Sequence, residues 1–531
     1  MKHAALVIFR SLIFILIGIT IGLYLADQSG HGLGFSLAHR DKVSKVLDLV
    51  RNTYVDSVDV DSIEGVAVNN VLQNLDPHSL YLPPQQALSI NERLEGGYTG
   101  IGVEYLLLRD TLVITHVTPD GPAEKAGLLA GDKVIDVDHK PFSGIHLTNQ
   151  GVNKAFRGPN DSQLLISVQR PQQKELKFIS ISRGHVDASS LDAAYITAPE
   201  TGYIKISKFA STTDADFRVA LAKLKTEGMQ KLILDLRGNG GGYLNTATAL
   251  ADEFLPKGKL IVYTKGTHEP RTDYFATDSG NFEHGKLAVL IDENSASASE
   301  ILSGALQDLD RAVIVGRRSY GKGLVQEQFP FGDGSAVNLT VARYYTPSGR
   351  SIQKSYRGGV ENYRNELAER VKHGELISEQ SYRNDSLFKT PTRYHTSNGR
   401  KVFSGGGIMP DIFVPADTAQ NTYTVDEIAN AQLFTAYVVD KMQPLLNKYN
   451  EDTFLDRYNV TDDQLNDFIV YCSRTLKEMD SNEIRLSKPY LKTLVKAFAA
   501  HFKWGDNAYF RVLNSDDETL KRAVIALNKS E

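Results

Sequence analysis

Cysteine is almost absent from this chain of 531 residues, which has one, Cys472, in the apolar run FIVYC. A single cysteine excludes any intrachain disulfide, and therefore a disulfide-stabilised scaffold, but it does not exclude an oxidising compartment. We expect Cys472 to be a buried helix residue. No cluster of cysteine, histidine and acidic residues has the spacing of a metal site, so we expect neither a metal nor a cofactor.

A strong excess of either charge is also missing. The net charge is −5, from 59 basic and 64 acidic residues. Nucleic-acid binding needs lysine and arginine concentrated on one face, and short clusters such as Arg317-Arg318 are more typical of solvated surface. We therefore expect no nucleic-acid partner. The length and a hydrophobic content of 41% support two to four domains with sizeable cores.

A long apolar run lies at the N-terminus, at Leu6–Ala26, preceded by Lys2 and interrupted by Arg10. Such a run predicts either a signal peptide or an uncleaved membrane anchor, within residues 1–26. The small residues of a cleavage site are missing, so we favour the anchor. Positive charge ahead of the span tends to stay inside, which predicts a cell-envelope protein, anchored in the inner membrane with the part that follows the run in the periplasm. If the run is cleaved, the protein is secreted.

The segment IDENSASASEILSGALQDL, residues 291–309, combines a strand end, a serine-rich turn and a helix start. Ser297-x-x-Glu300 is a capping-box pattern, and the apolar residues that follow recur at helical spacing. The preceding GKLAVLIDEN predicts a strand. The first amides of a helix are unpaired and carry the positive end of its dipole, so negative charge beside Ser297 would be stabilised there. A nucleophilic serine needs this environment, although most Ser-x-x-Glu patterns only cap a helix.

A second strand-to-loop junction lies upstream, in KLILDLRGNGGG. Residues 232–234 predict a buried strand, and Gly238–Gly242 forms a loop whose backbone can approach a ligand closely. An amide of this loop could supply a second oxyanion donor.

A serine nucleophile needs a base, and histidine is not available for this role by sequence position. None of the 13 histidines falls in the two segments above, and no Gly-x-Ser-x-Gly motif occurs. Lysine can replace histidine when it is neutral, which requires burial and the absence of nearby carboxylates. Lys322 lies between two glycines. If residues 322–328 are extended, Lys322 and Gln326 share one face, and Gln326 could orient the amine without charging it.

The motifs SASASE, DLRGNGGG, GKG-x-x-Q and YYTPSGRSIQ together resemble the carboxyl-terminal processing, or tail-specific, serine peptidases. The likeness extends from LDPHSLYL to GGGIMPDIFVP and covers most of residues 40–416. It implies that Ser297, rather than the neighbouring Ser295 or Ser299, is the nucleophile. It further implies a general base, its supporting glutamine and two backbone oxyanion donors, which correspond to Lys322, Gln326, Ala298 and Gly241.

A competing motif overlaps the same lysine. Gly316–Gly323, GRRSYGKG, fits the phosphate-binding loop G-x-x-x-x-G-K-[ST] except at its last position, where Gly323 has no hydroxyl for magnesium. The residues that follow, LVQEQFPF, predict a strand and not the helix that would bind phosphate. We therefore reject nucleotide hydrolysis.

Residues 97–183 contain several short β-rich runs and one helix, and resemble a PDZ domain. Its carboxylate-binding loop would be Gly100, Ile101, Gly102 and Val103. In such a loop, backbone N–H groups bind a chain terminus while the peptide adds as a strand to a sheet edge. The expected partners are protein or peptide substrates with accessible C-terminal tails.

The whole sequence predicts a multidomain α/β protein. After the N-terminal membrane segment we expect a helical region (36–95), the small β-rich PDZ-like domain (97–183) and an α/β peptidase core with a mixed sheet (184–355). A polar insertion (356–400), a return to the core (401–416) and a helical C-terminal region (417–531) would follow. A homo-oligomer or an activating adaptor is possible, and the same fold could serve as a non-catalytic tail-binding scaffold of the cell envelope.

Overall fold

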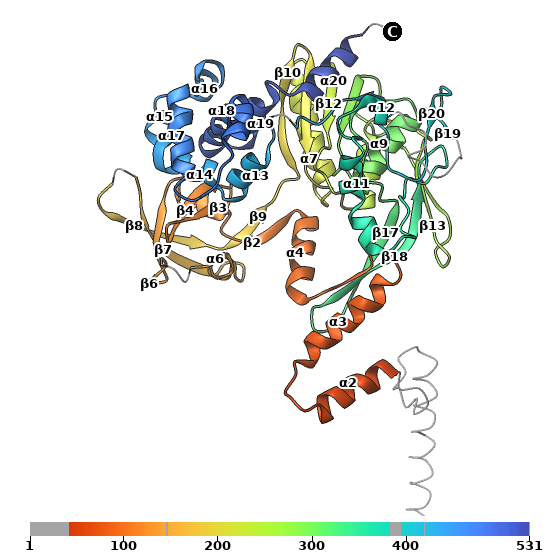
Figure 1. Ribbon diagram of the computed structural model, residues 1–531, viewed down its shortest axis with the longest axis horizontal. Coiled ribbons are helices and arrows are strands. Elements are labelled where there is room, and N and C mark those ends of the chain that lie inside the picture. Colours follow the sequence, from red (N-terminus) through yellow and green to blue (C-terminus); the bar gives the residue numbers. More distant parts are fainter. Residues whose placement is uncertain are drawn as a thin grey trace, which may run out of the picture. The chain divides into compact units, whose positions relative to one another are not determined.

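The computed structural model describes residues 18, 42–144, 147–171, 173–382, 394–418 and 420–529 (Figure 1). The chain divides into two compact units, Met1–Val71 and Leu72–Glu531. The first unit contains α2 (Lys42–Thr53) and most of α3 (Val60–Gln73). No helix among the described residues is long and apolar enough to cross a membrane. The expected anchor, Leu6–Ala26, lies outside those residues except for Gly18.

The second unit begins with β1 (Leu80–Leu82) and α4 (Pro84–Glu95) and continues into the β-rich module. Its sheet has the order β3-β4-β5-β7-β8, all antiparallel, with the short β6 paired to β5. The ribbon β2–β9 leads into and out of the module. The elements are β2 (Gly97–Gly100), β3 (Val103–Leu108), β4 (Thr111–Val117), α5 (Pro122–Lys125), β5 (Lys133–Val137), β6 (Lys140–Pro141), α6 (Asn149–Phe156), β7 (Gln163–Gln169), β8 (Leu176–Ser182) and β9 (Gly184–Asp187).

The α/β core is built on a mixed sheet, as predicted, and its strands have the order β10-β11-β12-β15-β16-β21. The β10–β11 pair is antiparallel and the other pairs are parallel. The strands are β10 (Leu191–Ala198), β11 (Thr201–Ile206), β12 (Lys231–Asp235), β15 (Lys286–Ile291), β16 (Val313–Gly316) and β21 (Ile412–Phe413). Carboxyl ends of parallel strands meet at one edge of a sheet, so the loops after β12 and β15 are neighbours.

Helices cover both faces of this sheet, and the interior positions of its central strands, 232–234 and 287–291, are apolar on both faces. On one face, α7 (Thr213–Thr226), α8 (Leu244–Asp252) and α9 (Ala298–Asp308) share an apolar cluster with Leu232, Leu234 and Val289. On the other face, α20 (Glu518–Asn528) contacts Ile233 and Leu290. The alternation of these side chains follows the period of two along a strand.

A second, antiparallel sheet lies beside the core, with the order β1-β18-β13-β14 and β17 paired to β18. Its remaining strands are β13 (Leu260–Lys265), β14 (Thr272–Phe275), β17 (Leu324–Pro330) and β18 (Ala336–Tyr345). Residues 324–330 are thus a strand, as the argument against a phosphate-binding loop requires. This strand begins two residues later than we expected, at Leu324, so Lys322 lies in the loop before it.

The segment expected to be a polar insertion contains α10 (Val360–Arg364), α11 (Glu366–Lys372), α12 (Glu379–Tyr382) and β19 (Tyr394–His395), and β20 (Lys401–Val402) follows it. Side chains of α11 and the turn after it are buried against the loop before Lys322. This contact brings the insertion next to the predicted base.

The C-terminal region is helical, as predicted. Its elements are α13 (Tyr423–Asn430), α14 (Leu433–Tyr437), the π-helix η2 (Val438–Met442), α15 (Gln443–Leu446), α16 (Glu451–Arg457), α17 (Asp462–Cys472), α18 (Ser481–Trp504) and α19 (Asp506–Asn514), followed by α20. Cys472 is buried at the end of α17, as expected. In Figure 1 these helices, in blue, lie against β3 and β4 and beside β10.

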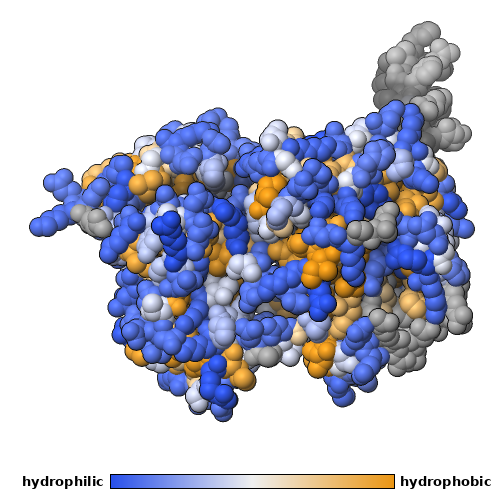
Figure 2. Space-filling view, turned by 90° about the horizontal axis from the view of Figure 1, so that it is seen from above, coloured by the Kyte–Doolittle hydropathy of each residue, from blue (hydrophilic) through white to orange (hydrophobic). Residues whose placement is uncertain are grey.

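The surface seen in Figure 2 is mostly hydrophilic, with apolar side chains gathered in separate patches. A mixture of this kind is ordinary for a folded protein, because polar residues are too few to cover its whole surface. The buried apolar residues of the described chain form separate clusters, mainly two on the faces of the mixed sheet, one in the β-rich module and one among the C-terminal helices.

Candidate active site

The serine loop and the glycine loop are joined by hydrogen bonds at the edge of the mixed sheet. The Gly238 N–H donates to Asp292 Oδ1 over 2.9 Å, and the Ala296 N–H donates to the Asn239 carbonyl over 3.0 Å. These bonds hold residues that are more than 50 positions apart in sequence in one arrangement. The two junctions identified from the sequence are therefore one site.

The structure distinguishes the three serines of the SASAS run. The hydroxyl of Ser295 donates to the Leu236 carbonyl over 2.8 Å, and that of Ser299 donates to the Asn239 carbonyl over 2.9 Å; both side chains are fully buried. Ser297 is half-buried and is the one of the three that lines a cavity. Residue types alone left this choice open, because only tertiary packing determines which hydroxyl is accessible.

Ser297 has an unusual backbone conformation, with φ 54° and ψ −112°. These angles are those of the first central residue of a type II′ turn, a position that normally requires glycine. A non-glycine residue there stores strain, and such strain is concentrated at functional sites. This turn resembles a nucleophile elbow, because it exposes the Ser297 side chain between a strand and a helix. The Gly-x-Ser-x-Gly signature of such elbows is absent.

Glu300 has a larger role than the helix cap that its spacing predicts. Its fully buried carboxylate accepts the Ser297 N–H over 2.9 Å, the Gly321 N–H over 2.7 Å and the Lys322 N–H over 2.8 Å. It also accepts the Ser319 hydroxyl. Burial raises the pKa of Glu300 to about 7, although the four donors favour the ionised form. One carboxylate thus fixes the backbone of both the predicted nucleophile and the predicted base.

Lys322 lines the same cavity as Ser297. Burial lowers the pKa of its amine, while the nearby Glu300 and Asp76 carboxylates oppose that change. The sequence led us to expect no carboxylate near Lys322, and this expectation is wrong. Burial is nevertheless the largest influence on the pKa of the amine, and it favours the neutral form. In the described part of the chain, no side-chain hydrogen bond or ion pair involves the Lys322 amine.

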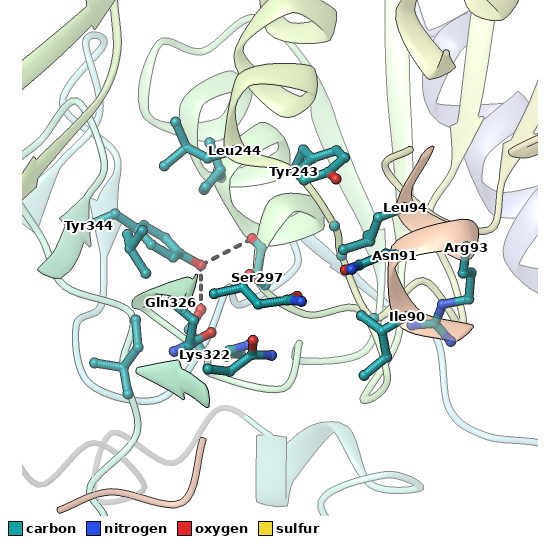
Figure 3. A pocket seen from close by; sticks show the side chains of 18 of the residues that line it. Ile90, Asn91, Arg93, Leu94, Tyr243, Leu244, Ser297, Lys322, Gln326 and Tyr344 are labelled. Carbon is teal, nitrogen blue, oxygen red and sulfur yellow. Dashed lines mark hydrogen bonds between the residues drawn. The ribbon is translucent and has the colours of Figure 1, made fainter. Parts of the chain in front are cut away.

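Tyr344 connects the serine turn to the loop that carries Lys322. Its buried hydroxyl lies 3.1 Å from the Ser297 carbonyl and also contacts the Lys322 carbonyl (Figure 3). Burial raises its pKa well above the usual value, so the phenol remains a donor. The residue belongs to the YYTPSGRSIQ motif, but nothing in its sequence position indicates this contact.

Gln326 lines the cavity together with Leu324, Val325 and Gln328, so the lining does not follow a strict alternation along the strand. Its amide nitrogen donates to the Thr340 hydroxyl over 3.2 Å, across the β17–β18 pair. The structure therefore places Gln326 beside the predicted base, and it adds Thr340, which the sequence did not single out.

The predicted oxyanion donors differ in their present hydrogen bonds. The N–H of Ala298, the first amide of α9, has no acceptor among the residues that are described. The N–H of Gly241 donates to Asn239 Oδ1 over 2.8 Å. Gly241, with φ 101°, is pressed so closely against the serine turn that an added Cβ would lie 2.8 Å from the Ser297 Cβ, so only glycine fits.

The cavity has a volume of about 590 Å³ and opens between the serine turn, β17 and α4. In Figure 3, Ser297, Lys322, Gln326 and Tyr344 lie together, and Ile90, Asn91, Arg93 and Leu94 of α4 lie across from them. The wall combines apolar side chains with polar ones, among them Ser297, Lys322 and Gln326. Polar groups that meet in a partly apolar cleft are a feature of ligand-binding sites.

His78 is a histidine that tertiary structure brings near the site. Its Nε2 lies 2.8 Å from the Tyr363 hydroxyl, and burial, with the nearby Lys322, lowers its pKa to about 4. It does not line the cavity. The structure therefore gives no reason to replace lysine by histidine as the candidate base.

The loop Gly100–Val103 lies between β2 and β3, at the edge of the module's sheet. Ile101 is fully buried, and its carbonyl accepts the Ala123 N–H over 2.8 Å. Helix α6 lies next to β3, where Tyr105 contacts Phe156 edge-on, with ring centroids 6.2 Å apart. An edge strand beside a helix is the arrangement into which a peptide can add as a further strand.

The geometry defines a class of protein: an α/β serine peptidase core joined to a peptide-binding module. Comparison with known proteins agrees. The model of peptidase family S41 matches residues 200–362, and the PDZ domain model matches residues 113–170. A family of unknown function, DUF8443, matches residues 424–505.

The chain is 36% identical over 313 residues to the carboxy-terminal-processing protease of Bartonella bacilliformis, covering 58% of this chain and 71% of the relative. It is 34% identical over 320 residues to the carboxy-terminal processing protease CtpB of Bacillus subtilis, covering 59% of this chain and 65% of the relative. A solved photosystem II D1 C-terminal processing protease is 29% identical, with a TM-score of 0.33, over 59% of this chain and 84% of that one. The chain belongs to the carboxy-terminal processing proteases of peptidase family S41.

Proposed function

We propose that this protein is a serine endopeptidase of the cell envelope that cleaves polypeptides near their C-termini through an acyl-enzyme. Family membership supports the serine peptidase class. The observation that carries the assignment of residues is that Ser297 and Lys322 line one cavity while the hydroxyls of Ser295 and Ser299 are bonded to backbone carbonyls.

In the proposed reaction, the neutral amine of Lys322 takes the proton of the Ser297 hydroxyl as Oγ attacks the scissile carbonyl carbon. The oxygen that gains negative charge accepts the N–H groups of Ala298 and Gly241, the latter after exchanging Asn239 Oδ1 for the substrate. The lysine ammonium then protonates the leaving amine as the peptide C–N bond breaks. Water, deprotonated by the same amine, hydrolyses the ester and restores the serine.

The PDZ domain would select the substrate. We propose that the N–H groups of Gly100–Val103 bind the terminal carboxylate and that the tail adds to the free edge of β3. Because α4 lines the cavity and runs directly into β2, a tail held by the module enters the cleft from that side. The chain N-terminal to the tail would then reach Ser297.

We also propose that residues 1–26 anchor the protein in the inner membrane, with the peptidase in the periplasm. The apolar run at Leu6–Ala26 and its flanking positive charges support this placement. An activating adaptor or a second copy of the chain would act on the part outside the cytoplasm.

The test is to incubate the full chain with a folded reporter ending in an apolar tail and to follow its mass with time. Wild type should release C-terminal fragments, and Ser297→Ala should release none. Ser303→Ala is the matched control, because its buried hydroxyl only donates to the Ser299 carbonyl on the same helix, 2.7 Å away, and alanine favours a helix. A reporter whose terminal carboxylate is amidated should be cut more slowly.

Binding of the reporter by wild type without any cleavage would contradict the peptidase and support the alternative, a non-catalytic tail-binding scaffold. Equal cleavage of the free and the amidated reporter would contradict recognition of the terminal carboxylate while leaving the peptidase in place.

A further inference from the structure

A lysine that acts as a base needs an acceptor for its own N–H groups. The neutral amine has one lone pair, which must face the Ser297 hydroxyl, so its two N–H donors must point elsewhere. A carboxylate in that position would hold the lysine in its charged form, whereas an amide oxygen does not. Gln326, which lines the same cavity, carries such an oxygen.

A glutamine side chain can present either end. Its oxygen and its nitrogen have nearly the same size, and rotation of the amide exchanges an acceptor for two donors. With its nitrogen toward Lys322, Gln326 would place donors against donors and would not orient the lone pair toward the serine. Some other group must therefore fix the amide.

The hydroxyl of Thr340 is that group. Its Oγ1 accepts a hydrogen bond from Gln326 Nε2 over 3.2 Å. With the nitrogen committed to Thr340, the carbonyl oxygen is the end of the amide that remains for the lysine. In this arrangement the threonine holds the nitrogen end of the glutamine and leaves its oxygen for the lysine.

A β-bulge makes this pair possible. Along the β17–β18 ladder, Val325 pairs with Ala342, but Gln326 pairs with Thr340, and Val341 is skipped. In a regular ladder Gln326 would lie opposite Val341, which has no hydroxyl to accept its amide. Bulges occur next to active sites, where they redirect a side chain, and this one brings a hydroxyl opposite the glutamine.

The backbone of Thr340 is held from the opposite side by the residues that lead into β1. The Thr340 N–H donates to Ser79 Oγ over 3.1 Å, and Ser79 Oγ donates to Asp76 Oδ2 over 2.6 Å. Both Asp76 and Ser79 are buried, at 6% and 1% exposure. A buried carboxylate in the LDPHSLYL segment therefore anchors the strand at the position that orients the glutamine.

We propose that Thr340 is a positioning residue for the peptidase reaction: its hydroxyl fixes the amide of Gln326 so that Oε1 accepts a hydrogen bond from Lys322. This inference rests on the proposed function, because it needs Lys322 to be the base. Thr340 touches neither substrate nor nucleophile and acts through Gln326.

The experiment compares Thr340→Val, which keeps the shape of the side chain but removes the acceptor, with Thr340→Ser, which keeps the hydroxyl. Each is made in the full chain, in the wild-type and in the Gln326→Ala background, and kcat, KM and the pH dependence of kcat/KM are measured with the tailed reporter. Thr340→Val should lower kcat about tenfold with KM little changed, since misplacing a catalytic group by ~1 Å costs up to about a hundredfold. The acidic limb of the pH profile of kcat/KM should move to lower pH in this variant. The lysine ammonium loses a hydrogen-bond acceptor, which lowers the pKa of the amine.

Thr340→Ser should restore both kcat and the position of the limb. In the Gln326→Ala background, Thr340→Val should change kcat by less than about twofold, because coupled residues are not additive. An equal loss in both backgrounds would overturn the proposal and leave Thr340 a structural role, and so would a Thr340→Ser variant as slow as Thr340→Val. Absence of Ser297-dependent cleavage in wild type would instead overturn the proposed function itself.

Discussion

At the scale of single residues, the Glu300 carboxylate accepts four hydrogen bonds beside the predicted nucleophile, Ser297. Its Oε2 accepts the Ser297 and Lys322 amides at 2.9 and 2.8 Å, so the predicted nucleophile and the predicted base are held by the same oxygen. The cost of this arrangement is a buried charge close to the lysine. Burial raises the pKa of Glu300 to about 7, which limits that charge near neutral pH.

We expect cleavage to increase with pH. Lys322 must be neutral to take the serine proton, and burial lowers its pKa, so the active form accumulates as the pH rises through that lowered value. Ionisation of Glu300, around pH 7, raises the lysine pKa again and should broaden the limb. The measurement is kcat/KM for the tailed reporter between about pH 5 and 10. A flat profile, with chemistry shown to limit the rate, would count against lysine as the titrating base.

The sequence placed Ser297, Lys322 and Gln326 through short motifs and a family resemblance, and the structure brings these three to one cavity. From the sequence, Glu300 was predicted only to cap a helix, and neither Tyr344 nor Thr340 was identified. Cap spacing is a local signal. Hydrogen bonds from β17, β18 and the lysine loop depend on how distant strands meet, and no local pattern carries that information.

At the scale of elements, the loop before Lys322 is held by the segment that the sequence marks as a polar insertion. Arg318 donates to Glu375 at 2.6 and 2.8 Å, and Arg370 donates to Glu375 at 3.0 Å and to the Arg318 carbonyl at 2.7 Å. These three side chains are between 3% and 5% exposed. The network lies just before the residues that contact Glu300, so it supports the base from outside the core strands.

Glu375→Gln should destabilise the protein and reduce cleavage. It removes the negative charge that two buried guanidinium groups share, and breaking a buried pair costs about 3–5 kcal/mol. Thermal unfolding and the rate of reporter cleavage measure the two effects. Glu369→Gln on the same helix is the control: its partner is Lys372, 3.7 Å away, and both side chains are more than half exposed, so little should change. Equal melting temperatures for the two variants would contradict a supporting role for Glu375.

At the scale of the whole second unit, the C-terminal helices contact both the PDZ domain and the peptidase core. Leu106 of β3 is 4% exposed within the apolar cluster of these helices, and Arg109 pairs with Asp440. On the core side, Asn507 accepts the Ala194 N–H over 2.8 Å, and Asp517 pairs with Arg237 over 2.6 Å. The outer face of the PDZ sheet is therefore covered by helices that are also bonded to the core.

Leu106→Asp should loosen this contact. Loss of the leucine alone is expected to cost about 2–5 kcal/mol, and an unpaired carboxylate in the apolar cluster adds to that cost. We expect a lower melting temperature and faster limited proteolysis at the junction of the two regions. Leu129→Asp, in the same domain but at a residue 51% exposed, is the matched control and should behave as wild type. Proteolysis at the wild-type rate for Leu106→Asp would show that the contact does not hold the PDZ domain.

The sequence by itself determined the α/β core with its mixed sheet, the PDZ domain, the helical C-terminal region and the short list from which Ser297, Lys322 and Gln326 come. Periodicity, turn residues and motif spacing are local properties, so they can be recognised in a single sequence. Only the tertiary structure decided which of the three serines faces the cavity. It decided that the Glu300 carboxylate accepts hydrogen bonds from both Ser297 and the lysine loop. It also decided that a bulge at Val341 places Thr340 opposite Gln326. Accessibility, burial and cross-strand register arise when distant segments pack, and that packing is a property of the whole fold.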